Sequence, residues 1–110
     1  MTLVALVTAV ALLTGTIHGT VMRGPIAPVC RIGTPCTAPA KGVTLSFTRN
    51  GSTRSTTTDD RGRYSIRLAA GVYAVKTNQR PFGTVPQPRT IRVKAAQSTR
   101  VDFAIDTGIR

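Results

Sequence analysis

Hydrophobic residues occupy every second position in most of the chain that follows residue 15. Val43, Leu45 and Phe47, for example, are separated by single polar residues. Alternate side chains of a β-strand point to opposite faces, so each such run predicts a strand with one buried and one solvated face. The pattern predicts seven strands, at residues 16–23, 42–49, 52–58, 62–68, 72–78, 89–95 and 99–106. Apolar residues do not recur three and four positions apart after residue 15, so no core helix is expected.

Residues with turn chemistry separate these runs. Asn50-Gly51 is typical of a type I′ hairpin turn, because both central positions of that turn need positive φ. Residues 59–62 and 69–71 are two short segments that end in glycine, and residues 81–88 contain three prolines. Short antiparallel strands with one apolar face each bury those faces by forming two packed sheets. We therefore expect an all-β fold, a seven-stranded antiparallel β-sandwich.

The first 13 residues form an uncharged hydrophobic run whose only polar members are Thr2 and Thr8. The run is shorter than the roughly 20 apolar residues of a membrane-spanning helix, and it has the length of the apolar core of a secretory signal. A buried hydrophobic strand or helix is the alternative. We expect a signal-like segment at residues 1–15 and a folded domain at residues 16–110. The mature protein would be secreted or associated with the cell envelope, without a transmembrane span.

The two cysteines agree with export. Cys30 and Cys36 are separated by five residues and flanked by prolines. An even number of cysteines in a short exported chain predicts a disulfide. Free thiols are the main alternative, because a metal site needs about four ligands and the chain has one histidine.

The segment at residues 56–77 resembles the sequence signature of carboxypeptidase regulatory-like domains. The matching positions are Thr58-Asp59, Gly62, Tyr64, Ile66, Leu68, Gly71, Tyr73 and Val75. The resemblance implies a transthyretin-like, immunoglobulin-like β-sandwich over residues 16–106, and it implies no particular activity. Residues 19–30 and 106–110 also resemble the corresponding segments of small exported proteins of actinobacterial type that have this domain.

The residues that carry the resemblance have roles in folding. Gly62 and Gly71 allow backbone angles that other residues resist. Asp59 can accept hydrogen bonds from turn amides, and Tyr64 and Tyr73 can place their rings in the core with their hydroxyls near its edge. These five residues are therefore expected to build the fold rather than to perform chemistry.

The residue inventory argues against an enzyme. His18 is the only histidine, glutamate and tryptophan are absent, and the acidic residues are four aspartates. A G-x-S-x-G motif is also absent, and Asp59-Asp60 beside two arginines is a poor calcium site. We expect no catalytic residue, no cofactor and no metal.

Charge is the one functional indication. Fifteen Lys and Arg against four acidic residues make the net charge +11. Alternation places five of the basic residues on the polar faces of their strands, namely Arg63, Arg67, Lys76, Arg92 and Lys94. Simple solvation of the charges is the first interpretation of such a surface. Because it also attracts polyanions, the functional hypothesis is contact with an anionic cell-envelope polymer or lipid surface.

A second hypothesis is a module that binds a glycan, a peptide or a protein partner. The proline-containing loops at residues 24–40 and 81–88 would form the rim of its site. Nucleic acid is disfavoured as a partner because of export, and because the outward positions lack an aromatic stacking platform.

Overall fold

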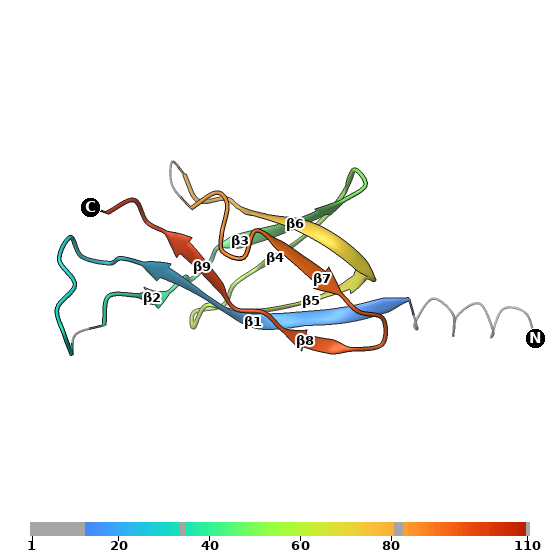
Figure 1. Ribbon diagram of the computed structural model, residues 1–110, viewed down its shortest axis with the longest axis horizontal. Coiled ribbons are helices and arrows are strands. Elements are labelled where there is room, and N and C mark those ends of the chain that lie inside the picture. Colours follow the sequence, from blue (N-terminus) through green and yellow to red (C-terminus); the bar gives the residue numbers. More distant parts are fainter. Residues whose placement is uncertain (1–12, 34, 81–82, 110) are drawn as a thin grey trace, which may run out of the picture.

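The chain forms two β-sheets that pack face to face (Figure 1). The computed structural model describes residues 13–33, 35–80 and 83–109, and this part contains no helix. Residues 1–12 of the expected signal-like segment lie outside the described part. The strands are β1 (Thr14–Gly24), β2 (Ala38–Pro39), β3 (Thr44–Arg49), β4 (Ser52–Thr57), β5 (Arg63–Ala69), β6 (Gly71–Thr77), β7 (Thr90–Val93), β8 (Ser98–Arg100) and β9 (Phe103–Asp106). The prediction of an all-β sandwich is confirmed.

The second sheet has the order β4-β3-β6-β7, and all its neighbouring strands are antiparallel. The first sheet is built around β1. On one side β1 pairs antiparallel with β5 and with the short strand β2. On its other side it pairs in parallel with β8 and then with β9. The expectation of a wholly antiparallel sandwich is therefore wrong for this edge, since alternation along a strand carries no information about the direction of its partner.

Three further differences concern the strands themselves. The run at residues 99–106 is two strands, because the Asp102 carboxylate accepts the Thr20 N–H at 2.9 Å where a ladder carbonyl would otherwise lie. Strand β2 lies in a segment expected to be a loop. In addition, β1 begins two residues before the expected domain boundary at residue 16, since Thr14 and Gly15 pair with β5.

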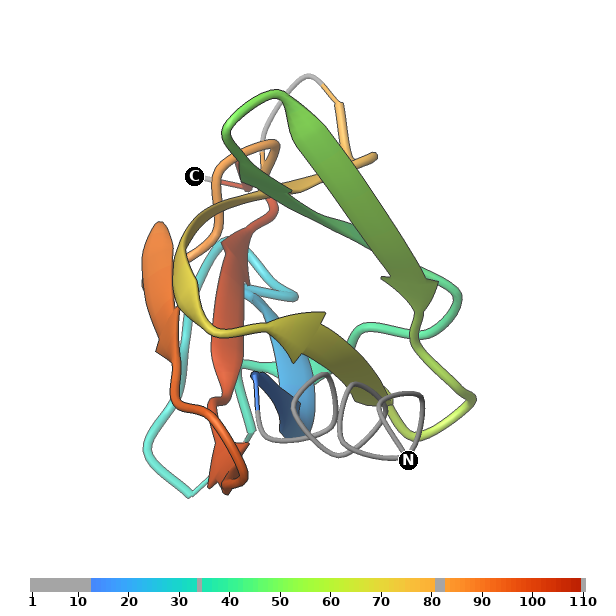
Figure 2. The same cartoon turned by 90° about the vertical axis from the view of Figure 1, so that its right-hand side faces the viewer.

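The core lies between the two sheets and follows the predicted alternation. In β5, for instance, Tyr64, Ile66 and Leu68 are buried while the residues between them are exposed. Rings from both sheets meet at its centre. The ring centroid of Phe47 in β3 lies 6.4 Å from that of Tyr64 and 6.3 Å from that of Phe103 in β9. Figure 2 shows the strands of the two sheets on opposite sides of this interior.

Candidate functional site

The turn between β4 and β5 is held by the Asp59 carboxylate. Its Oδ1 accepts the backbone N–H groups of Arg61 and Arg63, each at 2.9 Å. These two hydrogen bonds, with the nearby Arg63 guanidinium, hold the pKa of Asp59 below its usual value. Gly62 follows with φ +76°, and a β-carbon there would approach the Val21 carbonyl oxygen to 2.6 Å. Asp59 and Gly62 thus lie where a turn role requires them.

The two tyrosines have buried rings and engaged hydroxyls. Tyr64 donates its hydroxyl hydrogen to the carbonyl oxygen of Val101. Tyr73 donates to the carbonyl oxygen of Ala69 at 2.6 Å. Burial raises the pKa of Tyr64 well above its usual value, so this phenol stays protonated at neutral pH. Both hydroxyls therefore bind backbone carbonyl oxygens, as a role in folding requires.

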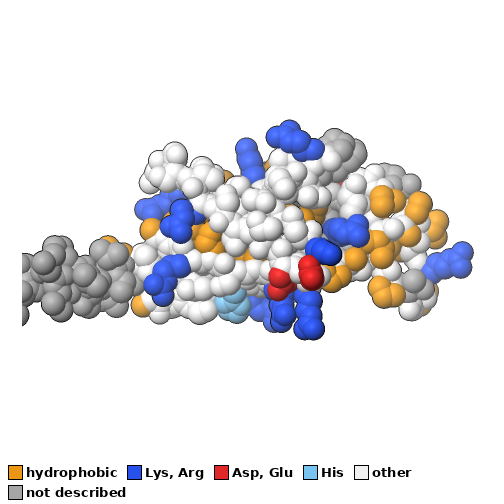
Figure 3. All heavy atoms as spheres, turned by 180° about the vertical axis from the view of Figure 1, so that it is seen from behind, with side chains coloured by type: hydrophobic (Ala, Val, Ile, Leu, Met, Phe, Trp, Pro, Cys, Tyr) orange, Lys and Arg blue, Asp and Glu red, His pale blue; other side chains and the backbone are white. Residues whose placement is uncertain are grey.

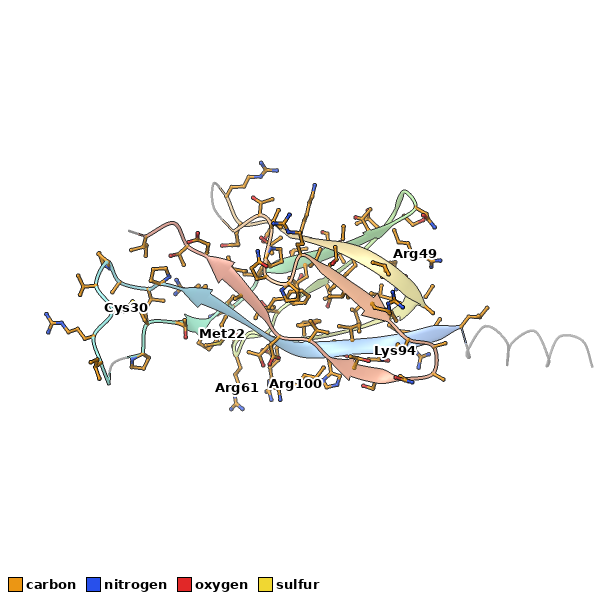
Figure 4. All side chains as sticks on the ribbon, viewed as in Figure 1. Met22, Cys30, Arg49, Arg61, Lys94 and Arg100 are labelled. Carbon is orange, nitrogen blue, oxygen red and sulfur yellow. A yellow bond between two sulfur atoms is a disulfide. The ribbon has the colours of Figure 1, made fainter. Side chains whose placement is uncertain are left out.

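Cys30 and Cys36 form a disulfide, with Cα atoms 5.5 Å apart. It closes the tip of the loop that joins β1 to β2, at one end of the molecule (Figure 4). Between and beside the cysteines the loop exposes Ile32 and Val29, the latter with 71% of its surface accessible. Figure 3 shows the apolar atoms concentrated at this end.

The five basic residues of the expected surface lie on opposite faces of the sandwich. Arg63 and Arg67 project from β5 on the outer face of the first sheet. Lys76 in β6 and Arg92 in β7 project from the outer face of the second sheet, and the exposed Lys94 directly follows β7. The fold therefore does not gather these five cations into one patch.

Carboxylates partly neutralise the outer face of the first sheet. Arg63 Nε lies 3.5 Å from Asp59 Oδ2, and Arg100 Nε lies 3.2 Å from Asp102 Oδ1. The Thr20 N–H, and after it Arg100, lower the pKa of Asp102. Figure 4 shows Arg61 and Arg100 extending from the same side of the molecule, below β1 and β5. This face is mixed in charge.

His18 also lies on the outer face of the first sheet, opposite Ser65 in β5 and beside Arg100 in β8. An open hollow of about 240 Å³ lies here, and its lining includes His18, Arg63, Tyr64 and Arg100. Within the described residues, His18 makes no side-chain hydrogen bond to Ser65 or Asp102. The carboxylate of Asp102 instead accepts from Thr20 N–H and Arg100, which is not the arrangement of a Ser-His-Asp triad.

The outer face of the second sheet carries a ladder of hydroxyl groups that the sequence analysis did not single out. Cross-strand pairs join β3 and β4, with oxygen–oxygen distances of 3.3, 3.2 and 3.0 Å, at Thr44–Thr57, Ser46–Ser55 and Thr48–Thr53. Lys76 lies next to Ser46 across the β3–β6 pair. The four strands of this sheet contain no acidic residue. In the sequence, Ser or Thr occupies every second position of residues 44–48 and 53–57, on both sides of the Asn50-Gly51 turn, and this pattern could have predicted the ladder.

Neither a metal-binding cluster nor a membrane-spanning helix is found among the described residues. His, Cys, Asp and Glu side chains form no group of three or more able to hold an ion in this part of the chain. Over the same ranges, no helix is long and apolar enough to cross a membrane.

The family model for the carboxypeptidase regulatory-like domain matches residues 31–106. The chain belongs to this family. The match begins after β1, so the central strand of the first sheet lies outside it. Within the matched region, this carboxypeptidase regulatory-like domain has the turn at Asp59 and the tyrosines described above.

The carboxypeptidase regulatory-like domain is similar to parts of larger proteins. Over 51 residues, 46% of the chain, it is 45% identical to the viral protein "Structural protein 27" (virus isolate Australia/Victoria), of which it covers 10%. Its fold resembles the Bacillus anthracis TIE protein, with TM-score 0.57, 18% identity, and coverage of 84% of this chain and 16% of that one. It also resembles the minor pilin of Streptococcus agalactiae, with TM-score 0.57, 15% identity, and coverage of 86% and 45%. The chain thus spans a minor part of each of these proteins.

Proposed function

We propose that this chain is a non-catalytic, exported β-sandwich module that docks on an anionic component of the cell envelope. The docking surface is the outer face of the second sheet, here called the hydroxyl face. It comprises the three Ser/Thr pairs of β3 and β4 together with Lys76, Arg92 and Lys94.

One observation supports this choice of face above the others. The hydroxyl face combines cations with an array of hydroxyl groups and has no carboxylate on its strands, whereas two arginines of the opposite face pair with Asp59 and Asp102. Hydroxyls and unpaired ammonium or guanidinium groups suit phosphate-bearing polymers and lipid headgroups. An acid-free face avoids the repulsion that a carboxylate would add.

A structural role agrees with the relatives. The names of two similar proteins describe a viral structural protein and a minor pilin. A basic residue close to an anionic membrane contributes about 1 kcal/mol, so two or three such residues bind weakly in one copy. Many copies in an assembly, or many phosphates in a polymer, would supply avidity. The module therefore fits a repeated surface better than a single soluble ligand.

Export is supported by the disulfide, since such bonds persist in oxidising compartments. We propose that the hydrophobic segment at residues 1–15 contains the export signal. Because Leu13 O accepts the Ala70 N–H and Thr14 starts β1, cleavage before residue 13 would keep both this hydrogen bond and the whole central strand.

The test measures retention on vesicles containing phosphatidylglycerol and on isolated anionic cell-wall polymer, at low and at physiological salt. The double variant Lys76→Gln/Arg92→Gln is compared with Arg63→Gln/Arg67→Gln, which removes the same charge from the opposite face. We expect a several-fold loss of retention for the first variant only. Equal losses would show that net charge alone acts, and the absence of retention at both salt concentrations would refute docking.

A second candidate is a glycan- or peptide-binding module. A hollow of about 300 Å³ lies where the end of β1 and the segments after β2 and β6 meet the C-terminal part of the chain. Its polar lining includes Arg23, Gln79, Arg80 and Asp106. Hydrogen bonds from these side chains to a neutral sugar or peptide would survive high salt, whereas docking of the hydroxyl face on an anionic surface would not. Binding on a glycan array that persists at high salt would favour this candidate.

A further inference from the structure

A hollow lies where the β3–β4 hairpin meets the turn between β5 and β6. It has a volume of about 410 Å³, within the range of small-molecule sites. Its lining residues are Arg49, Asn50, Ser52, Arg54, Ala69 and Tyr73. These residues belong to the end of the sandwich and not to the hydroxyl face.

Two arginines border this hollow at positions that place like charges close together. Arg49 is paired with Ser52 across the hairpin, and Arg54 lies two residues farther along β4. Such diagonal positions share one side of the hairpin, with β-carbons about 7–8 Å apart, and like charges at this range repel. An anion bound between the two guanidinium groups would reduce this repulsion and so stabilise the fold.

Within the described ranges, no carboxylate forms an ion pair with Arg49 or Arg54. The ion pairs of the described residues involve Lys41, Arg63 and Arg100. None of the residues lining the hollow is acidic.

The fold also fixes where the Arg49 guanidinium lies. A β-carbon at Gly71 would be 2.6 Å from Arg49 Nε and 2.7 Å from its Cζ, so the guanidinium lies directly over this glycine. Gly71 has φ +151°, which also disfavours other residues. Figure 4 shows Arg49 at the end of the molecule where β5 leads into β6. Arg49 is half-buried and lies beside the wall that Tyr73 forms.

We propose that this hollow binds a phosphate monoester. The two guanidinium groups carry two positive charges, which the nearly dianionic phosphate of a monoester neutralises and a single carboxylate does not. Asn50 and Ser52 add neutral hydrogen-bonding groups at the rim. The exposed methyl group of Ala69, beside the buried Tyr73, offers an apolar contact to the organic part of the ligand. This site is independent of docking through the hydroxyl face.

The experiment titrates the ¹⁵N-labelled full chain with phenyl phosphate, inorganic phosphate and acetate at constant ionic strength, and follows the amides of Ser52, Gly71 and Tyr73. We expect saturable shifts with phenyl phosphate and an affinity for acetate at least tenfold lower. Arg49→Gln and Arg54→Gln should each weaken phenyl phosphate at least tenfold. Arg67→Gln, which removes an exposed charge from β5, should change it less than twofold.

Each other outcome overturns a stated part of the proposal. Equal affinity for inorganic phosphate would assign the hollow to free phosphate and refute the monoester. Equal losses in all three variants would refute the site, because net charge alone would explain them. Arg54 is exposed on an edge strand, so its variant is expected to fold and keeps the test valid if Arg49→Gln does not.

Discussion

Thr58 connects three backbone segments at the end of the sandwich where β4 leads into the Asp59 turn. Its hydroxyl donates to the carbonyl oxygen of Ala40 and accepts the N–H of Val43 at 2.8 Å. All three residues are buried. The substitution Thr58→Val keeps the shape of the side chain and leaves one buried donor and one buried acceptor without partners.

The magnitude follows from these two groups. An unsatisfied buried polar group costs about 1–3 kcal/mol, so the two groups together cost about 2–6 kcal/mol. The added methyl offsets about 1 kcal/mol, so we expect Thr58→Val to lose about 1–5 kcal/mol. Thr58→Ser keeps the hydroxyl, removes one methyl and should lose about 1 kcal/mol. In a domain of this size each kcal/mol lowers the melting temperature by about 4–8 °C.

The assay is urea unfolding of the folded domain with both variants, compared at constant m. We expect the order of stability to be wild type, then Thr58→Ser, then Thr58→Val. Burial of apolar surface alone predicts the reverse order for the two variants. If the valine variant is as stable as the serine variant, the argument from unsatisfied backbone groups is refuted.

Two further predictions concern the core and the turn. Phe47 is fully buried between the sheets, so Phe47→Ala should lose about 3–5 kcal/mol in urea unfolding, whereas Val72→Ala on the exposed face should change stability by less than about 0.5 kcal/mol; similar effects would contradict the assigned faces. The lowered pKa of Asp59 means that its carboxylate stabilises the fold above the unfolded-state pKa of about 3.9, and that this contribution is lost as the pH falls through the folded-state pKa. The difference in melting temperature between wild type and Asp59→Asn should therefore be present at pH 7 and shrink below about pH 4, and a difference that stays constant to pH 2 would contradict it.

The alternation of apolar and polar residues was sufficient to place most strands and their buried faces. Leu45 and Phe47, Ile66 and Leu68, and Phe103 all lie in the core as the pattern predicts. The reason is local: the period of two in a strand determines which side chains share a face, whatever the neighbouring strand. The Asn50-Gly51 turn is similarly local, and Asn50 and Gly51 both have positive φ.

The alternation does not specify which strands pair or which side chains meet, and the pairing of strands far apart in sequence determined both. The parallel pairing of β1 with β8 and β9 depends on the path by which the chain returns to the first sheet. Whether two outward cations meet depends on which sheet each strand joins, so Arg63 and Arg92 lie on opposite faces although each alternates correctly within its own strand. Conversely, Arg49 reaches Gly71 because β3 pairs with β6, a contact between residues far apart in sequence. The sequence by itself determined the class of fold and the face of each side chain, and the tertiary structure determined which side chains came together.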